Sequence, residues 1–179
     1  KSVAVEFTSM SKTFSMPGWR MGFAVGNELL IAALEKIKSY LDYGAFTPIQ
    51  VAAASALSSD PTTIEKVRGV YRKRRDVLVD AMGKAGWNIP SPEATMFAWA
   101  QVPEKFKSLG SLEFSKVLLK EADISVAPGI GFGEYGENFV RIGLVENEHR
   151  IRQAARNIKS VFSKADKILS EYSPDQKGV

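Results

Sequence analysis

Apolar residues along the chain recur with two periods, which predict short strands and longer helices. Residues 3–7 and 21–25 are rich in β-branched and aromatic side chains and are expected to form two strands. Between residues 28 and 41 the apolar positions return every three or four residues, as in an amphipathic helix, and Asn27 is suited to cap it. Residues 48–57 are almost all apolar, with Thr47 as the expected cap. Because such a helix has no polar face, we expect it to be buried on most sides, against a partner in further sequence or in another subunit.

A long helical pattern over residues 61–84 separates two parts of the chain. At about 1.5 Å per residue this helix would span roughly 36 Å, and Gly86 is expected to end it. Just before it, residues 58–61 combine capping residues with a proline, which signals a break followed by a new helix. We therefore predict a domain boundary there, between residues 1–59 and residues 60–179.

The part that follows the long helix is predicted to be a compact α+β unit. Three strands are expected, over residues 95–102, 124–127 and 139–145. A helix over residues 111–121 should begin at Ser111 as its cap. Asn147 should cap a last long helix whose apolar stripe ends at Leu169, and residues 173–179 should form a frayed tail. The chain as a whole is thus expected to be of the α/β class.

Composition narrows the chemistry that the chain can carry. There is no cysteine, which excludes disulfides and thiolate catalysis. The single histidine, His149, argues against a zinc site or a serine–histidine triad, and no metal is expected. The net charge of +4 comes largely from the basic run at residues 72–75, whose helical pattern without interleaved aromatics favours a solvated face over a nucleic-acid site. No apolar run is long enough to span a membrane, and residues 1–7 do not form a signal peptide.

The stretch from residue 9 to residue 26 carries the strongest indication of chemistry. Its two cations, Lys12 and Arg20, lie among small residues, with Ser9 and Ser11 on either side of Met10 and a Pro-Gly turn before the arginine. A lysine amine can condense with an aldehyde, whereas hydroxyls and a guanidinium suit a phosphate. A solvated surface lysine is the plainer alternative, but it would not need these neighbours. We interpret the stretch as an anchor for pyridoxal 5'-phosphate.

A second candidate is Arg141, in the middle of the strand predicted over residues 139–145. Alternation along a strand places it on the same face as Phe139 and Gly143. An arginine on an edge strand, pointing to water, is one interpretation. The other is a buried arginine, which needs an anionic partner such as a substrate carboxylate.

The glycine-rich residues 129–136 precede this strand. Gly131, Gly133 and Gly136 match the spacing of a dinucleotide-binding fingerprint, but the fingerprint requires a helix to follow, and a strand is expected here. We therefore reject that function and expect a flexible loop near a substrate site or a cluster of turns.

The stretch from Ser9 to Arg20 resembles the lysine motif of the class I/II aminotransferases, which are fold type I pyridoxal-phosphate enzymes. The strand that carries Arg141 resembles the strand with that family's carboxylate-binding arginine. The resemblance extends over residues 1 to about 170. Residues 39–50 and 127–133 are most similar to bacterial alanine (glutamate–pyruvate) aminotransferases, a group whose relatives include LL-diaminopimelate and aspartate aminotransferases.

The resemblance implies a role for each candidate residue. Lys12 would form the internal aldimine and move a proton between the substrate and the cofactor. Ser9, Ser11 and Arg20 would bind the cofactor phosphate, and Arg141 would bind the substrate α-carboxylate. The substrates would be an amino acid, alanine or glutamate, and a 2-oxo acid. Thr47 stands where diaminopimelate-specific relatives carry asparagine, which argues against that substrate.

The family resemblance also sets expectations for the whole protein. The chain would be a C-terminal fragment, with residues 1–59 as the remnant of the large cofactor-binding domain and residues 60–179 as the small domain. The aspartate that pairs with the cofactor ring would lie in an absent N-terminal region, so the fragment alone should be inactive. A cytoplasmic homodimer is implied, with no nucleic-acid or membrane partner. Three alternatives stay open. They are an LL-diaminopimelate or aspartate aminotransferase, another pyridoxal-phosphate enzyme such as a lyase or decarboxylase, and a regulator with an aminotransferase-like domain.

Overall fold

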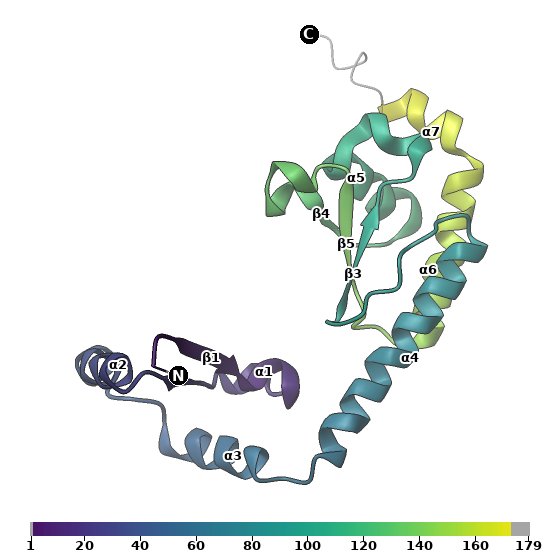
Figure 1. Cartoon of the computed structure of the whole chain (residues 1–179). Coiled ribbons are helices and arrows are strands. Elements are labelled where there is room, and N and C mark those ends of the chain that lie inside the picture. Colours follow the sequence, from purple (N-terminus) through teal and green to yellow (C-terminus); the bar gives the residue numbers. More distant parts are fainter. Residues whose placement is uncertain (1, 173–179) are drawn as a thin grey trace. The chain divides into compact units, whose positions relative to one another are not determined.

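The computed structural model describes residues 2–172, and these divide into two compact units between Gly69 and Val70, within helix α4 (Figure 1). The helix itself covers Thr62–Lys84 and matches the long helix predicted from the sequence. Each unit is described by itself. The domain boundary predicted between residues 59 and 60 stays a prediction, and residues 173–179, expected to be a tail, lie outside the described part.

The first unit consists of a hairpin and helices. Strands β1 (Val5–Ser9) and β2 (Gly22–Gly26) are antiparallel, with Val5 opposite Gly26 and Ser9 opposite Gly22. Between them lie the short helix α1 (Met10–Thr13) and the 3₁₀ turn η1 (Pro17–Trp19). Helices α2 (Glu28–Leu41) and α3 (Thr47–Leu57) follow the hairpin. Both strands therefore form where the sequence predicts them, shifted by one or two residues.

Helices α2 and α3 differ in how well the sequence predicts them. The Asn27 side chain accepts a hydrogen bond from the amide of Leu30 at 3.1 Å, which confirms it as the cap of α2. In α3 the cap is Phe46 rather than Thr47, so Thr47 and Pro48 are the first two helical residues. This change is small because proline is accepted throughout the first turn.

The described residues do not supply the burial predicted for α3. Ala53 is its only buried residue, whereas Val51 is 63% exposed and Leu57 is 52% exposed. Within the first unit, as described, no other element covers those sides of α3. The prediction that its partner lies in further sequence or in another subunit stays a prediction.

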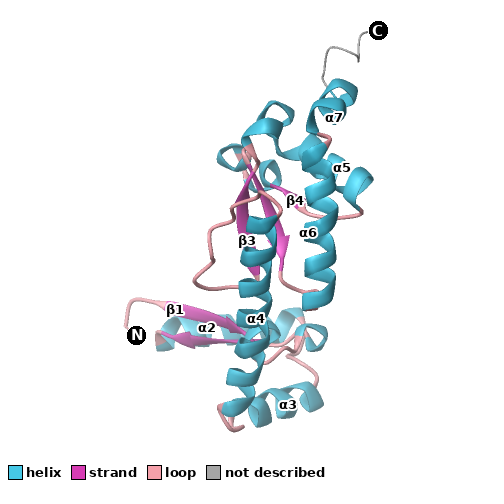
Figure 2. Ribbon diagram, turned by 90° about the vertical axis from the view of Figure 1, so that its right-hand side faces the viewer, coloured by secondary structure: helices cyan, strands magenta, loops and turns pink. Residues whose placement is uncertain are grey.

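The second unit is built on a three-stranded antiparallel sheet. The strands are β3 (Phe97–Gln101), β5 (Phe139–Gly143) and β4 (Ala127–Pro128), with β5 in the centre. Around the sheet lie helices α5 (Gly110–Ala122), α6 (Glu148–Ser163) and α7 (Ala165–Tyr172) and the 3₁₀ segments η2 (Glu104–Leu109), η3 (Gly129–Phe132) and η4 (Glu134–Gly136). Figure 2 shows α4 and α6 running alongside the sheet.

One face of this sheet meets the helices and forms a continuous core. Alternate residues of β3 and β5 point into it, namely Ala98, Ala100, Val140 and Ile142. Leu78 and Met82 of α4 and residues of α5, α6 and α7 complete the same cluster. At its centre four aromatic rings are in contact: Trp87, Phe106, Phe114 and Phe162. The opposite face of the sheet carries the other alternate residues, Arg141 among them.

Two predictions for the helices of the second unit are wrong. Ser111 does not cap α5, because the helix begins one residue earlier and Ser111 is fully buried in its first turn. The last helix is not continuous but breaks at Lys164 into α6 and α7. The break turns the chain so that Ala165 and Ile168 both reach the core. The cap at Asn147 is confirmed, since its side chain accepts hydrogen bonds from the next helical amides.

The basic run at residues 72–75 is solvated only in part. Arg72 and Lys73 are exposed, as predicted. Arg74, however, donates hydrogen bonds to the carbonyl oxygens of Leu144 and Val145, at 3.1 and 3.0 Å. This arginine therefore holds α4 against the end of β5. None of the helices in residues 2–172 combines the length and apolar character needed to cross a bilayer.

Candidate functional site

The loop that joins β1 to β2 is closed at its base. Ser9 and Gly22 face each other as the last pair of the hairpin, and the amide of Met10 donates to the carbonyl of Met21 at 3.0 Å. A side chain at Gly22 would press on the carbonyl oxygen of Thr8, so the two strands approach closely there. Met10 is fully buried beneath the loop. These contacts give residues 10–21 a defined shape in a unit with few other buried side chains.

Within this loop the lysine stands beside both serines. The Ser9 hydroxyl accepts a hydrogen bond from the amide of Ser11 at 3.2 Å and thereby caps α1, the helix that carries Lys12. Lys12 is exposed, and among residues 2–172 it forms no ion pair. Its amine is therefore available to a ligand.

Arg20 is brought back toward the same loop by its backbone. Its φ of 50° and ψ of 44° are left-handed, a conformation that costs about 1–2 kcal/mol for a residue with a β-carbon. The guanidinium donates a hydrogen bond to the carbonyl of Pro17 at 3.0 Å, which fixes the direction of the side chain. Strained residues of this kind gather at functional sites. Within the described residues Arg20, too, forms no ion pair with a carboxylate.

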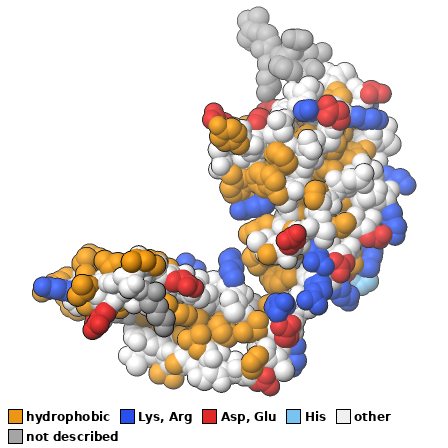
Figure 3. Space-filling model, in the orientation of Figure 1, with side chains coloured by type: hydrophobic (Ala, Val, Ile, Leu, Met, Phe, Trp, Pro, Cys, Tyr) orange, Lys and Arg blue, Asp and Glu red, His pale blue; other side chains and the backbone are white. Residues whose placement is uncertain are grey.

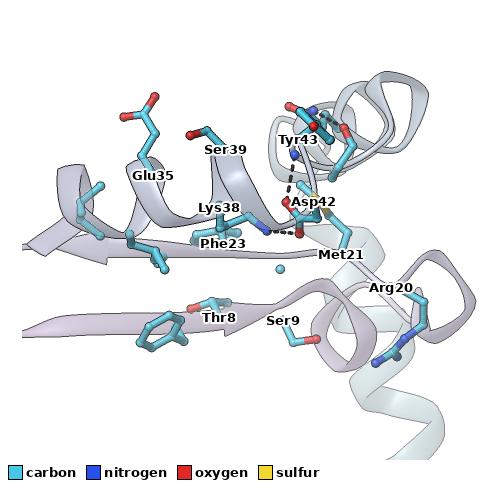
Figure 4. A pocket seen from close by; sticks show the side chains of 18 residues that line it. Thr8, Ser9, Arg20, Met21, Phe23, Glu35, Lys38, Ser39, Asp42 and Tyr43 are labelled. Atoms are coloured by element: carbon cyan, nitrogen blue, oxygen red, sulfur yellow. Dashed lines mark hydrogen bonds and ion pairs between the residues drawn. The ribbon is translucent and has the colours of Figure 1, made fainter.

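Ser9 and Arg20 also line an open pocket of about 1070 Å³ in the first unit. Figure 4 shows both side chains at the same end of the hairpin, with the pocket extending between the strands and α2. Ser11 and Lys12 are not among the residues that line it. The pocket thus contains two of the four residues predicted to bind the cofactor, and all four lie within residues 9–20.

An ion pair lies at the far wall of this pocket (Figure 4). Lys38 and Asp42 are 2.6 Å apart, and Asp42 also accepts a hydrogen bond from the amide of Gly44 at 2.9 Å. The hydrogen bond from Lys38, and after it the one from Gly44, hold the pKa of the Asp42 carboxyl below its ordinary value. Sequence reasoning did not predict that this pair lines a pocket.

Arg141 belongs to the second unit and lies on the central strand of its sheet. Trp99 of β3 and Ala127 of β4 are its partners on either side, so the interpretation as an edge-strand arginine is wrong. The side chain is half-buried, and among the described residues it forms no ion pair. Its guanidinium carbon lies over the ring of Phe97, 4.3 Å from the centroid, and over that of Phe132 at 4.5 Å.

The glycine-rich residues before Arg141 form a tightly built pair of turns, η3 and η4. Gly129 and Gly136 pack backbone against backbone, and a side chain on either one would collide with the other. Ser111, fully buried, accepts a hydrogen bond from the amide of Ile130 at 3.1 Å. Of the two expectations for this segment, a flexible loop or a cluster of turns, the second is confirmed.

Glu137 provides the acceptor that Ser111 needs. Its carboxylate accepts hydrogen bonds from the amide and from the hydroxyl of Ser111, both at 3.0 Å. It therefore takes the place of a cap at the start of α5. Sequence reasoning missed this residue and the two rings beside Arg141. Alternation could place Phe97 on the face of Arg141, but only the register between strands brings them together.

Comparison with known proteins decides the family. Residues 2–158 match the family model of aminotransferase class I and II. The chain belongs to the class I/II aminotransferases. Its resemblance to this family, inferred above from the lysine loop and the Arg141 strand, is thereby confirmed.

Individual relatives and a solved structure agree with this assignment. The chain is 70% identical over 167 residues to the AatC protein of Rhizobium meliloti, and the match covers 93% of the chain and 41% of the relative. It is 53% identical over 173 residues to the glutamate-pyruvate aminotransferase AlaC of Escherichia coli, with 97% of the chain and 42% of the relative covered. The apo structure of BacF from Bacillus subtilis superposes with a TM-score of 0.84 at 38% identity, covering 89% of the chain and 40% of BacF.

Two facts follow from these comparisons. The fold is that of the C-terminal part of a fold type I aminotransferase, as predicted. The chain spans about two fifths of the length of the relatives that it matches, 41% and 42% for the two named above.

Proposed function

We propose that this chain is part of a pyridoxal 5'-phosphate-dependent aminotransferase that exchanges an amino group between alanine or glutamate and a 2-oxo acid. The observation that carries the proposal is the closed loop at the end of the hairpin. It holds an exposed lysine, two serines and an arginine without a carboxylate partner within one short stretch. The membership in the aminotransferase family and the similarity to a glutamate-pyruvate aminotransferase support the substrate class.

The donors of the loop fit the cofactor's phosphate. Ser9 and Ser11 offer hydroxyls, and Arg20 offers a planar guanidinium whose contact with the carbonyl of Pro17 leaves further N–H donors free. A phosphate would supply the negative charge that Arg20 lacks among the described residues. Lys12 offers the primary amine that an aldehyde requires. When bound, the cofactor would act as an electron sink for the substrate's α-carbon.

The remaining roles are those that the family resemblance implies. The Lys12 amine would take a proton from the substrate α-carbon and deliver it to the C4′ carbon of the cofactor. Arg141 would hold the α-carboxylate through two parallel N–H donors, which fixes the direction of the α-carbon. The half-buried position of Arg141 strengthens such a pair, because water competes less there than at the surface.

The rest of the proposal rests on the family. Because the chain spans about two fifths of its relatives, we propose that further sequence supplies the remaining cofactor contacts, and that these 179 residues alone are inactive. A cytoplasmic homodimer is proposed on the same resemblance, with residues 43–47 near the partner subunit. Neither a nucleic acid nor a membrane is proposed as a partner.

Amino-group transfer by the full-length protein tests the proposal. Alanine, glutamate, aspartate and LL-diaminopimelate would be offered as donors, each with and without pyruvate or 2-oxoglutarate. We expect turnover only when a donor and an acceptor are both present, with alanine and glutamate preferred. Lys12→Ala should abolish turnover, whereas the exposed Lys36 can be changed to Ala as a control. Turnover without an acceptor would indicate a lyase or decarboxylase, and an active Lys12→Ala variant would refute the assignment of Lys12.

A further inference from the structure

We propose that Phe97 and Phe132 are positioning residues that clamp the Arg141 guanidinium between their rings and present its edge to a substrate carboxylate. The inference rests on the proposed function, in which Arg141 binds that carboxylate. It adds two residues from separate elements, β3 and η3, to the substrate-binding part of the protein.

The geometry of the three side chains carries the inference. The guanidinium carbon lies 4.3 Å from the ring centroid of Phe97 and 4.5 Å from that of Phe132, well within the range of a cation–π contact. A guanidinium that meets a ring through its π-face uses none of its hydrogens in that contact. Its donors all lie in its plane, in the arrangement that a carboxylate accepts through both oxygens. In the proposed clamp the part of Arg141 that recognises a carboxylate therefore stays available.

The clamp also restricts a side chain that is otherwise flexible. A free arginine samples many rotamers and loses that freedom when it binds a ligand. Rings on the guanidinium remove part of this freedom before the substrate arrives. The expected consequence is tighter substrate binding, with no direct effect on the chemistry at the α-carbon.

Each ring is itself held in place. Phe97 stands opposite Gly143, which has no side chain to compete for the space on that face. Phe132 meets the ring of Trp99 edge-on at 5.6 Å, and Trp99 stacks on Phe139 at 5.5 Å. The backbone of η3, which ends at Phe132, is tied to buried Ser111 through the amide of Ile130.

The two rings lie outside the core of their unit. That core lies on the other face of the sheet, and Phe132 is 52% exposed. Around Arg141 the described residues provide aromatic faces and no paired carboxylate, which leaves its charge to be met by a ligand.

Kinetics of the full-length enzyme with Phe97→Leu, Phe132→Leu and the double variant test the clamp. We expect KM for the amino acid to rise roughly three- to tenfold in each single variant and further in the double variant, with kcat within about twofold. Phe132→Tyr should restore the original KM. Tyr135→Leu is the matched control, since Tyr135 lies in the next turn and is 92% exposed, and its KM should not change.

A second measurement detects the clamp by NMR, without measuring turnover. In NMR spectra of the 179-residue chain, the side-chain protons of Arg141 should be shifted upfield by the two rings. Each Phe→Leu variant should reduce that shift, and Tyr135→Leu should not. The variant Arg141→Ala distinguishes the clamp from the proposed carboxylate site. If it raises KM while the Phe variants keep the original KM, the clamp is refuted and the proposed function stands; if it leaves KM unchanged, the proposed carboxylate site itself is refuted.

Discussion

The two units of this chain contain similar helical patterns and differ in what those patterns achieve. In the second unit the apolar stripes of four helices and one face of the sheet meet in a continuous core. In the first unit, among the described residues, only Met10 and Ala53 are buried apolar side chains. Apolar side chains there lie on the surface instead (Figure 3), including Phe7, Leu29 and Leu41.

The difference shows which parts of a fold need a core. Helix α2 has no buried residue in the described chain; Asn27 caps its first turn, and Lys38 pairs with Asp42 at its end. The loop with Lys12 likewise keeps its shape through backbone hydrogen bonds and capping. The position of Arg141, by contrast, depends on a sheet whose other face is packed against helices. The proposed cofactor residues therefore rest on local interactions, and the proposed substrate arginine rests on tertiary packing.

The largest effect is expected from a cavity in the second unit. Phe114 is fully buried and contacts both Trp87 and Phe106, so Phe114→Ala should lower the free energy of unfolding of that unit by about 3–5 kcal/mol. Leu29, which is 80% exposed on α2, is the matched control in the first unit, and Leu29→Ala should change the free energy of unfolding of that unit by less than about 0.5 kcal/mol.

Urea unfolding can measure each variant in its own unit, with Trp19 as the fluorescent reporter of the first unit for Leu29→Ala. With Trp19 and Trp99 changed to Phe, the fluorescence of Trp87 reports the core into which Phe114 packs. Equal losses in the two variants would contradict the distinction between the units.

An intermediate effect is expected from the anchor between Glu137 and Ser111. Removal of the carboxylate leaves a buried hydroxyl and an amide without their acceptor, so Glu137→Ala should destabilise the second unit by about 1–3 kcal/mol. Glu134, exposed in the same segment, provides the control, and Glu134→Ala should be nearly neutral. The same fluorescence assay applies. A stability loss in Glu134→Ala as large as in Glu137→Ala would show that the anchor has no special role.

The smallest effect is expected in the first unit at acid pH, where Asp42 loses its charge. The pKa of Asp42 is lowered, first by the hydrogen bond from Lys38 and then by that from Gly44. A group of this kind stabilises the folded chain above its unfolded pKa of about 3.9, and the contribution disappears as the pH falls through the folded pKa. The Gly44 amide resonance should therefore titrate at a pH below that of an unperturbed aspartate. Asp42→Asn should remove the titration; an unchanged titration would assign it to another group.

Sequence reasoning identified the features that depend on neighbours in the chain. The caps at Asn27 and Asn147, the long helix α4 and the lysine loop all follow from local spacing. The chemistry proposed for residues 9–20 was likewise read from one stretch. In these places a short segment contains all the groups that interact.

The features that it missed join distant segments. The sequence predicts Ser111 as a cap because nothing near it in the chain indicates Glu137 as its acceptor. The break at Lys164 brings residues of α7 to the core. A continuous helix would fit the same apolar pattern, so the pattern does not indicate the break. The rings on Arg141 come from β3 and η3, and their meeting depends on strand register and on the close contact of two glycines. Local patterns carry no information on such pairings.

Covalent trapping of the cofactor tests the central claim most directly. The full-length protein would be incubated with pyridoxal 5'-phosphate and reduced with borohydride, which fixes the cofactor to the amine that holds it. Peptide mass mapping should then find the added mass on Lys12, with none on the control Lys36, and Lys12→Ala should lose both the adduct and the absorbance near the visible edge. An adduct on a different lysine, or an undiminished adduct in Lys12→Ala, would contradict the proposed role of the loop between β1 and β2.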